Sequence, residues 1–571
     1  MYLFRYLAGW LCCFAIIGGV WPTTGHAQTW QWAVGQTVTN TSLGNAECRA
    51  VVRDASGQLV VAGEFRGTIQ LGSLTLTSAG NYDVFVARLD AQGHWLQAAR
   101  AGGPDYDNAS GLALDAGGNA VLTGQFQSRS VDVGPFVLTN ADQTYNTLDI
   151  FIARFNSQGN WVQAQRAGGI YSDYAYGGLV LDASGNAVIA GTFASPTLPL
   201  GAFTLTGVGS YPMFVARLSP QGTWMQAAIA GNAQNHGTWP TSLCLDQAGN
   251  VMVAGSFQGP ATQFGTFTLT NADSAPTNAN TDVFVARLSS QGTWTTAIRA
   301  GDFGTEHISG IALDLAGNLV VAGQFYGPTT TLGSTTLTNA DPLAAGRSSA
   351  DIFMARLSPQ GSWSQVIRAG GPDPESVNGL VLDAGGNAVI TGEFRNSVVQ
   401  FGTFAILNNY NPASSQLVYL ARLRADGQWT NALAGGTFGV HRSNAVVLDA
   451  QGQAIICGIV LTMAQFGPTT LSPPINGGLY VARTNGLPLA TAAPVRHQAG
   501  LMPNPAHMTV LVTLPENTAP QSVSLLDALG RCVRSYPLPA HATSTTLDLT
   551  GLAPGCYVLR CGATSGKLVV E

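Results

Sequence analysis

Charged side chains are scarce in this 571-residue sequence, at 10% of the residues, and lysine occurs only once, as Lys567. An average soluble protein carries about 25% charged residues. The formal net charge is −6, from 25 basic and 31 acidic side chains. A chain of this balance is not expected to bind nucleic acid or an acidic membrane surface. Its repeated segments also lack a helical period, which excludes a coiled coil.

Long apolar runs are confined to the N-terminus. Arg5 precedes an apolar stretch from Tyr6 to Trp21, and a short polar region then ends at Ala27. This pattern is typical of a secretory signal peptide, so residues 1–27 are predicted to be one, cut before Gln28. No other stretch is long enough to cross a bilayer. We therefore expect a chain that leaves the cytoplasm and has no stable membrane span.

Cysteine is sparse, and its spacing matches no zinc pattern. Six cysteines remain once Cys12 and Cys13 leave with the predicted signal peptide: Cys48, Cys244, Cys457, Cys532, Cys556 and Cys561. The first three are interpreted as buried small apolar residues. Cys532 could pair with Cys556 or Cys561 in an oxidising compartment, and the sequence leaves that open.

What the sequence has in abundance is internal repetition. The unit Leu112–Gly124 occurs seven times and the unit Val84–Trp95 recurs with it, so an Asp, an Ala-Arg pair and a Trp recur in register. The repeated aspartates are Asp54, Asp115, Asp182, Asp246, Asp314, Asp383 and Asp449. Each repeat predicts four strands, and four strands repeated seven times are typical of a β-propeller.

The two ends of the repeat region predict closure of a ring. The last repeat stops after Leu479–Arg483 without a Trp strand, and Gln28–Val34 matches the Trp strand Gly292–Ile298. The N-terminal strand should therefore complete the seventh blade and remove an open sheet edge. Each repeated Trp is expected to pack between neighbouring blades.

The repeats resemble the seven-bladed β-propeller repeats of many bacterial surface and secreted proteins. The matching residues are the hairpins of the type Leu313–Asn318 and the strands of the type Asp282–Leu288, and the resemblance covers residues 28–486. It implies an all-β fold, a seven-bladed propeller. It implies no particular activity, since such propellers serve many roles.

The remaining chain breaks the repeat. Residues 487–500 form an Ala- and Pro-rich linker, and residues 501–571 predict a small Ig-like β-sandwich from short alternating strands. This tail closely resembles the C-terminal type A sorting domain of the type IX secretion system in its motifs, which are Pro503–Ala506, Asp527–Arg531, Leu552–Tyr557 and Lys567–Val570. The resemblance implies the type IX secretion machinery as a partner and a secreted or surface-attached protein. An ordinary adhesive Ig-like module is the alternative.

The repeated Asp and Arg are interpreted as structural. An Asp before a Gly turn bonds local backbone N–H groups, and the Arg serves as a packing stem or a pair between blades. Long loops on one face of the ring are the expected binding surface. The candidate ligand-binding residues there are Tyr106, Tyr171, Tyr174, Tyr176, Trp239, Glu306 and His307.

No catalytic residue is assigned, although Glu306, His307, Asp373 and Glu375 could form an acid/base pair. No cofactor is expected. Calcium stays open, because the turns at Asn140/Asp142, Asn271/Asp273 and Asn339/Asp341 offer oxygen ligands. The leading hypothesis is a secreted or surface β-propeller that binds a glycan or protein, or acts as a scaffold, without catalysis. The alternatives are an extracellular enzyme acting on polysaccharide and a structural component of the surface or of gliding.

Overall fold

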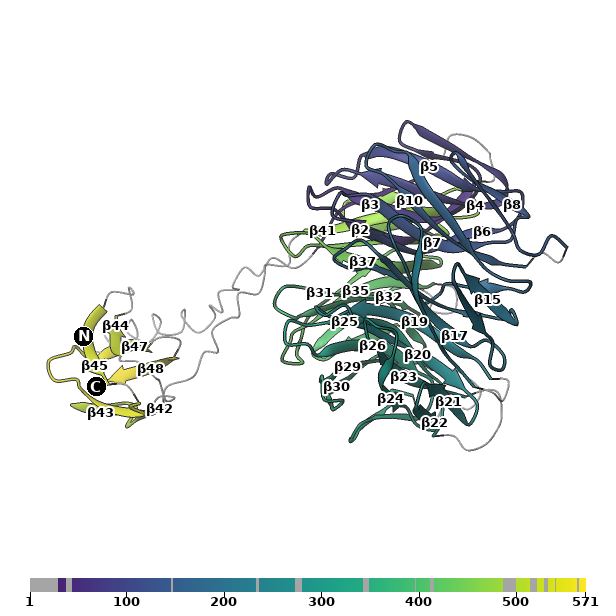
Figure 1. Cartoon of the computed structure of the whole chain (residues 1–571). Coiled ribbons are helices and arrows are strands. Elements are labelled where there is room, and N and C mark those ends of the chain that lie inside the picture. The colour runs from purple at the N-terminus through teal and green to yellow at the C-terminus, as the bar shows by residue number, and fades with distance from the viewer. Residues whose placement is uncertain are drawn as a thin grey trace. The chain divides into compact units, whose positions relative to one another are not determined.

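The computed structural model in Figure 1 describes the chain in segments: residues 29–36, 44–144, 147–232, 236–272, 280–341, 349–395, 397–410, 415–485, 500–513, 521–527, 532–539, 541–561 and 564–571. The predicted signal peptide lies outside them, as does the predicted linker apart from Gly500. The chain divides into two compact units, Met1–Leu487 and Pro488–Glu571.

The first unit is built from antiparallel sheets with four main strands each, and the described residues contain seven of them, here called blades 1 to 7. In order from the inside of the ring outward, the strands of blades 1 to 3 are β2 (Asn45–Arg53), β3 (Leu59–Leu71), β4 (Leu74–Leu89) and β5 (Trp95–Gly102); β6 (Asp107–Leu114), β7 (Ala120–Phe126), β10 (Asp149–Phe155) and β11 (Trp161–Ala167); and β12 (Asp173–Tyr174) with β13 (Leu179–Leu181), β14 (Ala187–Phe193), β17 (Met213–Leu218) and β18 (Trp224–Ala230).

The strands of blades 4 to 7 follow the same order. They are β19 (Thr238–Leu245), β20 (Val251–Gln258), β23 (Thr281–Leu288) and β24 (Trp294–Ala300); β25 (Glu306–Leu313), β26 (Leu319–Phe325), β29 (Asp351–Leu357) and β30 (Trp363–Ala369); β31 (Glu375–Leu382), β32 (Ala388–Phe394), β35 (Leu417–Leu423) and β36 (Trp429–Gly435); and β37 (His441–Leu448), β38 (Ala454–Val460), β41 (Gly478–Asn485) and β1 (Thr29–Gly35).

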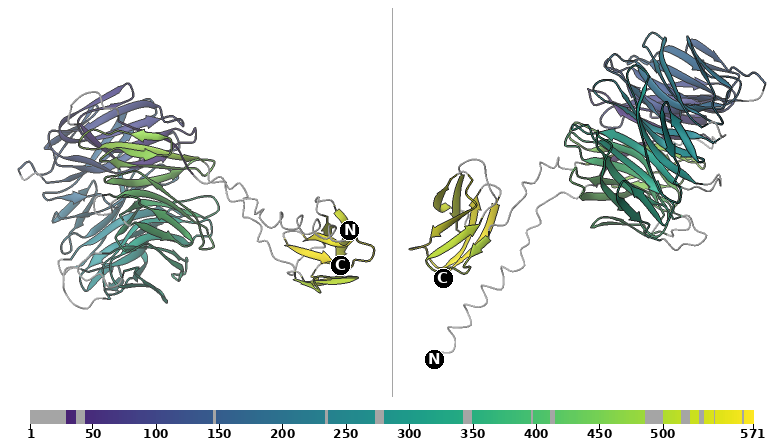
Figure 2. Two further views of the ribbon diagram at one scale, coloured as in Figure 1. Left: turned by 180° about the vertical axis from the view of Figure 1, so that it is seen from behind. Right: turned by 60° about the horizontal axis from the view of Figure 1, so that its bottom comes forward.

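The blades form a ring. Each innermost strand contacts the innermost strand of the next blade, and β37 of the last blade contacts β2 of the first. The purple strands of blade 1 and the light-green strands of blade 7 lie side by side in the views of Figures 1 and 2. β1 pairs with β41 from Thr29 opposite Asn485 to Gly35 opposite Tyr480. The predicted closure by the N-terminal strand is confirmed.

The burial of each strand reflects its place within a blade. β26 and β29 carry almost continuous buried residues, because both faces of a blade pack against neighbours. The edge strands β25 and β30 are only half buried along much of their length. Gly317 supplies the positive φ of +81° that the turn between β25 and β26 needs.

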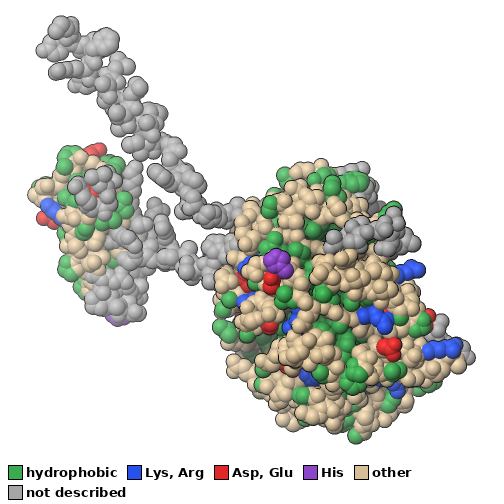
Figure 3. Space-filling model, turned by 90° about the horizontal axis from the view of Figure 1, so that it is seen from above, with side chains coloured by type: hydrophobic (Ala, Val, Ile, Leu, Met, Phe, Trp, Pro, Cys, Tyr) green, Lys and Arg blue, Asp and Glu red, His purple; other side chains and the backbone are tan. Residues whose placement is uncertain are grey.

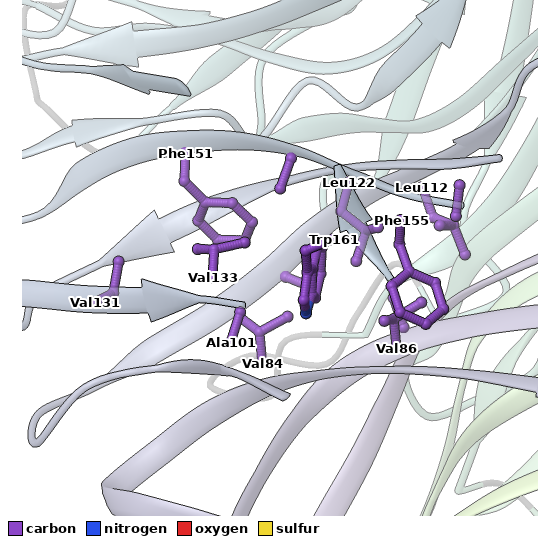
Figure 4. Close-up of a cluster of buried hydrophobic side chains, with 14 of the residues drawn as sticks. Val84, Val86, Ala101, Leu112, Leu122, Val131, Val133, Phe151, Phe155 and Trp161 are labelled. Atoms are coloured by element: carbon purple, nitrogen blue, oxygen red, sulfur yellow. The ribbon is translucent and has the colours of Figure 1, made fainter. Parts of the chain in front are cut away.

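The tryptophans pack between blades, as the sequence predicted. Trp161 of blade 2 lies among Val84 and Ala101 of blade 1 and Phe151 and Phe155 of its own blade (Figure 4). Its indole N–H donates to the carbonyl oxygen of Arg100 in β5 at 3.2 Å. In the same way Trp294 donates to the carbonyl of Ile229 in the preceding blade, and Trp30 to that of Ala434.

One set of strands was not predicted. The stretch between the second and third strand of a blade folds into a short outer hairpin. These hairpins are β8 (Ser130–Val133) with β9 (Phe136–Thr139), β15 (Thr197–Leu200) with β16 (Phe203–Thr206), β21 (Ala261–Phe264) with β22 (Phe267–Thr270), β27 (Thr329–Leu332) with β28 (Thr335–Thr338), β33 (Val398–Phe401) with β34 (Phe404–Leu407), and β39 (Ala464–Phe466) with β40 (Thr469–Leu471). They pack on outer strands, as β8 does on β5. Much of this connection therefore belongs to the rim of the ring and not to a loop face.

The second unit contains two antiparallel sheets that share one hydrophobic core, which includes Val510, Leu525 and Leu559. The strands are β42 (Gly500–Met502), β43 (Thr509–Thr513) and β46 (Ser544–Asp548) in one sheet, and β45 (Cys532–Leu538), β44 (Gln521–Leu526), β47 (Gly555–Cys561) and β48 (Thr564–Val570) in the other. Its Ig-like topology stays a prediction.

The six cysteines among the described residues are free thiols in this structure. Cys48 and Cys457 are buried, as predicted, and Cys244 is partly buried. The pairing of Cys532 that the sequence left open is not formed here.

Candidate functional site

The repeated aspartates have the structural role that the sequence predicted. Asp314 accepts hydrogen bonds from the backbone N–H groups of Ala316 at 3.0 Å and Asn318 at 2.8 Å, and so closes the turn after the innermost strand. The six equivalent aspartates accept from the same two positions.

The repeated arginines hold neighbouring blades together. Arg356 of blade 5 forms an ion pair with Asp314 at 2.7 Å and also donates to the carbonyl oxygen of Gly386 in blade 6 at 2.7 Å. Arg88 and Arg154 reach the turn glycine of the next blade in the same manner. The repeated aspartates and arginines therefore serve the fold itself. We look for a ligand site among residues that differ between the blades.

The innermost strands present such residues at one level of the ring. The register places seven residues at this level, the third residue of β2 and the second residue of the other innermost strands: Glu47, Asn108, Tyr174, Trp239, His307, Ser376 and Arg442. These seven residues are called the mouth ring here. Each lies opposite the penultimate residue of the second strand or its equivalent, as His307 lies opposite Gln324. Three of the candidates from the sequence, Tyr174, Trp239 and His307, belong to it.

Aromatic rings gather in blades 1 to 3. The rings of Tyr174 and Tyr176 stack with centroids 4.8 Å apart, and Tyr82 meets Tyr106 edge to face at 5.6 Å. Burial, and then the nearby Tyr174, Tyr106 and Tyr211, raise the pKa of Tyr176. Tyr106 lies within electrostatic reach of the stacked pair, and Tyr106, Tyr174 and Tyr176 are called the tyrosine cluster here. Tyr176 remains 49% exposed.

Charged groups adjoin the tyrosine cluster, and sequence reasoning missed them. Arg49 forms ion pairs with Glu64 at 2.6 Å and Glu47 at 3.0 Å. Burial and then the charge of Glu64 raise the pKa of Tyr106, so Tyr106 lies within electrostatic reach of this group. The signal was present in the repeat, because Glu64 stands in the Gly-x-Phe segment where blades 2 and 5 have Gln125 and Gln324.

Glu393 is the equivalent of Glu64 in blade 6, opposite Ser376. Its carboxylate accepts a hydrogen bond from the Asn378 amide at 2.5 Å. Burial is the main cause that raises the pKa of Glu393 to about 7, and Arg442 opposes it. This carboxyl group can therefore hold or release a proton near neutral pH.

Glu306 has a different environment from the one the sequence suggested. Its side chain is 0% exposed and accepts from the backbone N–H of Asp302 at 3.4 Å. Burial and then the charge of Asp282 raise the pKa of Glu306 to about 8. Glu375 occupies the same position in blade 6, accepts from the N–H of Gly371 at 3.0 Å, and has its pKa raised to about 9 by burial and then by Asp351. The two glutamates lie in different blades, and each supports its own loop.

Tyr171 and the calcium candidates form hydrogen bonds within their own blades. The N–H of Tyr171 donates to the Ser195 hydroxyl at 3.0 Å, while its ring is half exposed. Asn140 accepts from the N–H of Asp142, and Asn339 from that of Asp341, so both pairs form turns. Asp273 lies outside the described residues.

The described residues lack two further features, a cluster of metal ligands and a membrane-spanning helix. They contain no group of three or more His, Cys, Asp or Glu side chains arranged to hold a metal ion. In the same part of the chain, no helix has the length and hydrophobicity needed to cross a membrane.

Known structures share features with this chain at low identity. An ulvan lyase of polysaccharide lyase family PL25 has 10% identity over 81% of this chain and 97% of its own, with a TM-score of 0.43. A protein of unknown function from Bacteroides caccae has 9% identity over 64% and 95%, with a TM-score of 0.30. A Synechocystis apocarotenoid oxygenase has 9% identity over 90% and 97%, with a TM-score of 0.33. No curated protein matches the chain.

The tail matches a family model. The secretion system C-terminal sorting domain covers residues 501–571, which are the residues of the predicted sorting domain. This domain marks proteins that the type IX secretion system exports. The chain therefore ends in a secretion system C-terminal sorting domain, and its destination is the cell surface or the extracellular space.

Proposed function

We propose that the propeller is a binding module that takes a glycan at the tyrosine cluster and does no covalent chemistry. The observation that carries this proposal is the stacked pair of Tyr174, which is partly buried, and Tyr176, which is half exposed. Tyr106 lies within electrostatic reach both of Tyr176 and of the Arg49–Glu64 ion pair. Aromatic rings pack against the apolar faces of sugars, and nearby charged groups bond their hydroxyls. An exported protein meets such glycans outside the cell.

A glycan array tests the proposal. The wild-type protein should bind at least one class of polysaccharide, and Tyr176→Ala should weaken that binding at least about tenfold, because truncated aromatic anchors cost the most binding energy. Tyr410→Ala is the matched control, since Tyr410 is a tyrosine of blade 6, 40% exposed and outside the cluster. Equal binding by the two variants would contradict the proposal.

A second candidate function is action on polysaccharide, and Glu393 favours it. A carboxyl group with a pKa of about 7 is suited to general acid/base catalysis. Incubation of the bound polysaccharide with the protein should then release chain ends, and Glu393→Gln should abolish that release while binding persists. Binding without any product from the wild-type protein rejects this candidate. An experiment in which the wild-type protein shows no binding and releases no product would favour a structural role at the surface.

A further inference from the structure

Each junction between blades brings one residue of a second strand against one residue of the next innermost strand. At the junction of blades 6 and 7 these are Thr391 and Ser443, whose hydroxyl oxygens lie 2.7 Å apart. Thr391 lies opposite Gly379, just beyond a bulge in the innermost strand, and Ser443 lies just before the equivalent bulge in β37. At the junction of blades 5 and 6 the same positions hold packed apolar residues, Ala322 and Val377.

At the junction of blades 7 and 1 both positions are cysteine. Cys457 lies opposite Ala445, as Thr391 lies opposite Gly379, and Cys48 precedes the bulge in β2, as Ser443 does in β37. The two side chains are fully buried in one hydrophobic cluster. The Cys457 sulfur is 3.8 Å from the carbonyl oxygen of Cys48.

The junction of blades 7 and 1 therefore places two thiols where the junction of blades 6 and 7 has two hydroxyl groups in contact. The hydroxyl oxygens of Thr391 and Ser443 are in hydrogen-bond contact, which brings their Cβ atoms close together. A disulfide needs Cβ atoms about 3.5–4.5 Å apart, and its two sulfurs replace two such oxygens. The backbone around Cys48 is also held in place, because the Asn444 amide of blade 7 donates to its carbonyl at 2.8 Å.

We propose that Cys48 and Cys457 form a disulfide bond in the exported protein, and that this bond locks the ring at the junction of its first and last blades. Both S–H bonds break and one Sγ–Sγ bond forms. The two protons and two electrons pass to the disulfide of a thiol oxidoreductase, through a mixed disulfide, and that disulfide is reduced to a dithiol.

The sorting domain directs export of the chain, and an exported chain leaves the reducing cytoplasm and meets an oxidising environment in which this reaction can occur. The reaction must precede or accompany closure of the ring, because both thiols are inaccessible afterwards. Burial, and then the neighbouring Cys457, raise the pKa of the Cys48 thiol well above its usual value, so the closed ring protects the thiols from attack.

The bond would join residues that are 409 positions apart in the chain. Cross-links over long loops restrict the unfolded chain the most, so the bond should favour the folded ring. It would also be a covalent addition to the pairing of β1 with β41 at the same blade.

The test is peptide mapping of the full chain after secretion through an oxidising compartment. The protein is denatured in iodoacetamide without reductant and digested. We expect a peptide pair linked through Cys48 and Cys457, and a melting temperature several degrees lower when the protein is refolded with a reductant. Alkylation of both thiols, or linkage of either to Cys244, would overturn the proposal.

The chain offers its own matched control. The double variant Cys48→Ser, Cys457→Thr copies the pair at the junction of blades 6 and 7 and so keeps the packing. It should fold and have a melting temperature that no longer depends on reductant during refolding. If wild type and this variant respond equally to reductant, the stabilising role of the bond is rejected.

Discussion

The first residue of the innermost strand shows how one position can vary between blades without binding a ligand. Asp107, Asp173, Glu306, Glu375 and His441 differ in size and charge, yet each accepts a hydrogen bond from the backbone N–H four residues earlier. All five are buried. The requirement at this position is for an acceptor that closes the preceding loop, and several side chains meet it.

The burial of these carboxyl groups predicts a pH dependence of stability. The folded-state pKa is about 8 for Glu306 and about 9 for Glu375, against 4.5 without burial. Between pH 6.5 and 8 the folded chain therefore keeps protons that the unfolded chain has lost, so stability falls as the pH rises. Each glutamate contributes up to about 1.4 kcal/mol per pH unit. His441, with a pKa of about 4, acts in the opposite direction and only below about pH 6.5.

Urea unfolding of wild type and Glu375→Gln at several pH values checks this expectation. The variant keeps an oxygen acceptor for the Gly371 N–H but has no proton to lose, so its stability should fall less steeply above pH 6.5. Parallel curves for the two proteins would show that the Glu375 carboxyl is not protonated in the folded state.

At the scale of elements, the tryptophan strand connects a blade to its neighbour. Trp294 packs against Phe264 of its own outer hairpin at 5.1 Å and donates its N–H to blade 3. The turn glycine Gly265 lies against the indole, and its φ of +60° is a backbone conformation that residues with a side chain rarely adopt. One residue thus holds three elements together: its own strand, the outer hairpin and the preceding blade.

Trp294→Ala should destabilise the propeller by about 3–5 kcal/mol, because it leaves a large cavity between two blades and an unpaired carbonyl at Ile229. Calorimetry or denaturant unfolding measures the loss. Leu315→Ala is the control, since Leu315 is 87% exposed in a turn and should change stability little. A melting temperature equal to that of wild type for Trp294→Ala would refute the packing role.

The tryptophan strands could be predicted and the outer hairpins could not, for a physical reason. The Trp recurs in register with the Asp and Arg of every repeat, so its structural role is visible in the sequence. The hairpin strands have only three or four residues, many of them Thr, and a Gly stands in each turn between them, which is a pattern typical of loops. The alternation of buried residues in β8, with Val131 and Val133 inside, was the signal that remained.

At the scale of the whole molecule, closure of the ring followed from counting strands, whereas contacts between blades did not. The stacking of Tyr174 on Tyr176 beside Tyr106, and the meeting of Cys48 with Cys457, join different parts of the repeat region. They depend on how one blade rotates against the next. Charged side chains make up 10% of the sequence, and the face in Figure 3 shows few of them among neutral ones.

The last prediction concerns closure itself. A chain that begins at residue 36 lacks β1, and it therefore exposes the edge of β41 and removes Trp30 from its contact with Phe466 at 5.0 Å. Burial of such an aromatic is worth about 4–6 kcal/mol. The truncated protein should melt at a lower temperature and self-associate through the open edge. Light scattering and calorimetry measure both effects.

A synthetic peptide of residues 28–36 provides the internal control, because it can occupy the place of β1 without a covalent link. The peptide should restore the monomer and raise the melting temperature, while a scrambled peptide of the same composition should do neither. A truncated chain that stays monomeric and melts like wild type would mean that the ring is held by contacts between blades alone. The pairing of the two chain ends would then be a consequence of closure and not its cause.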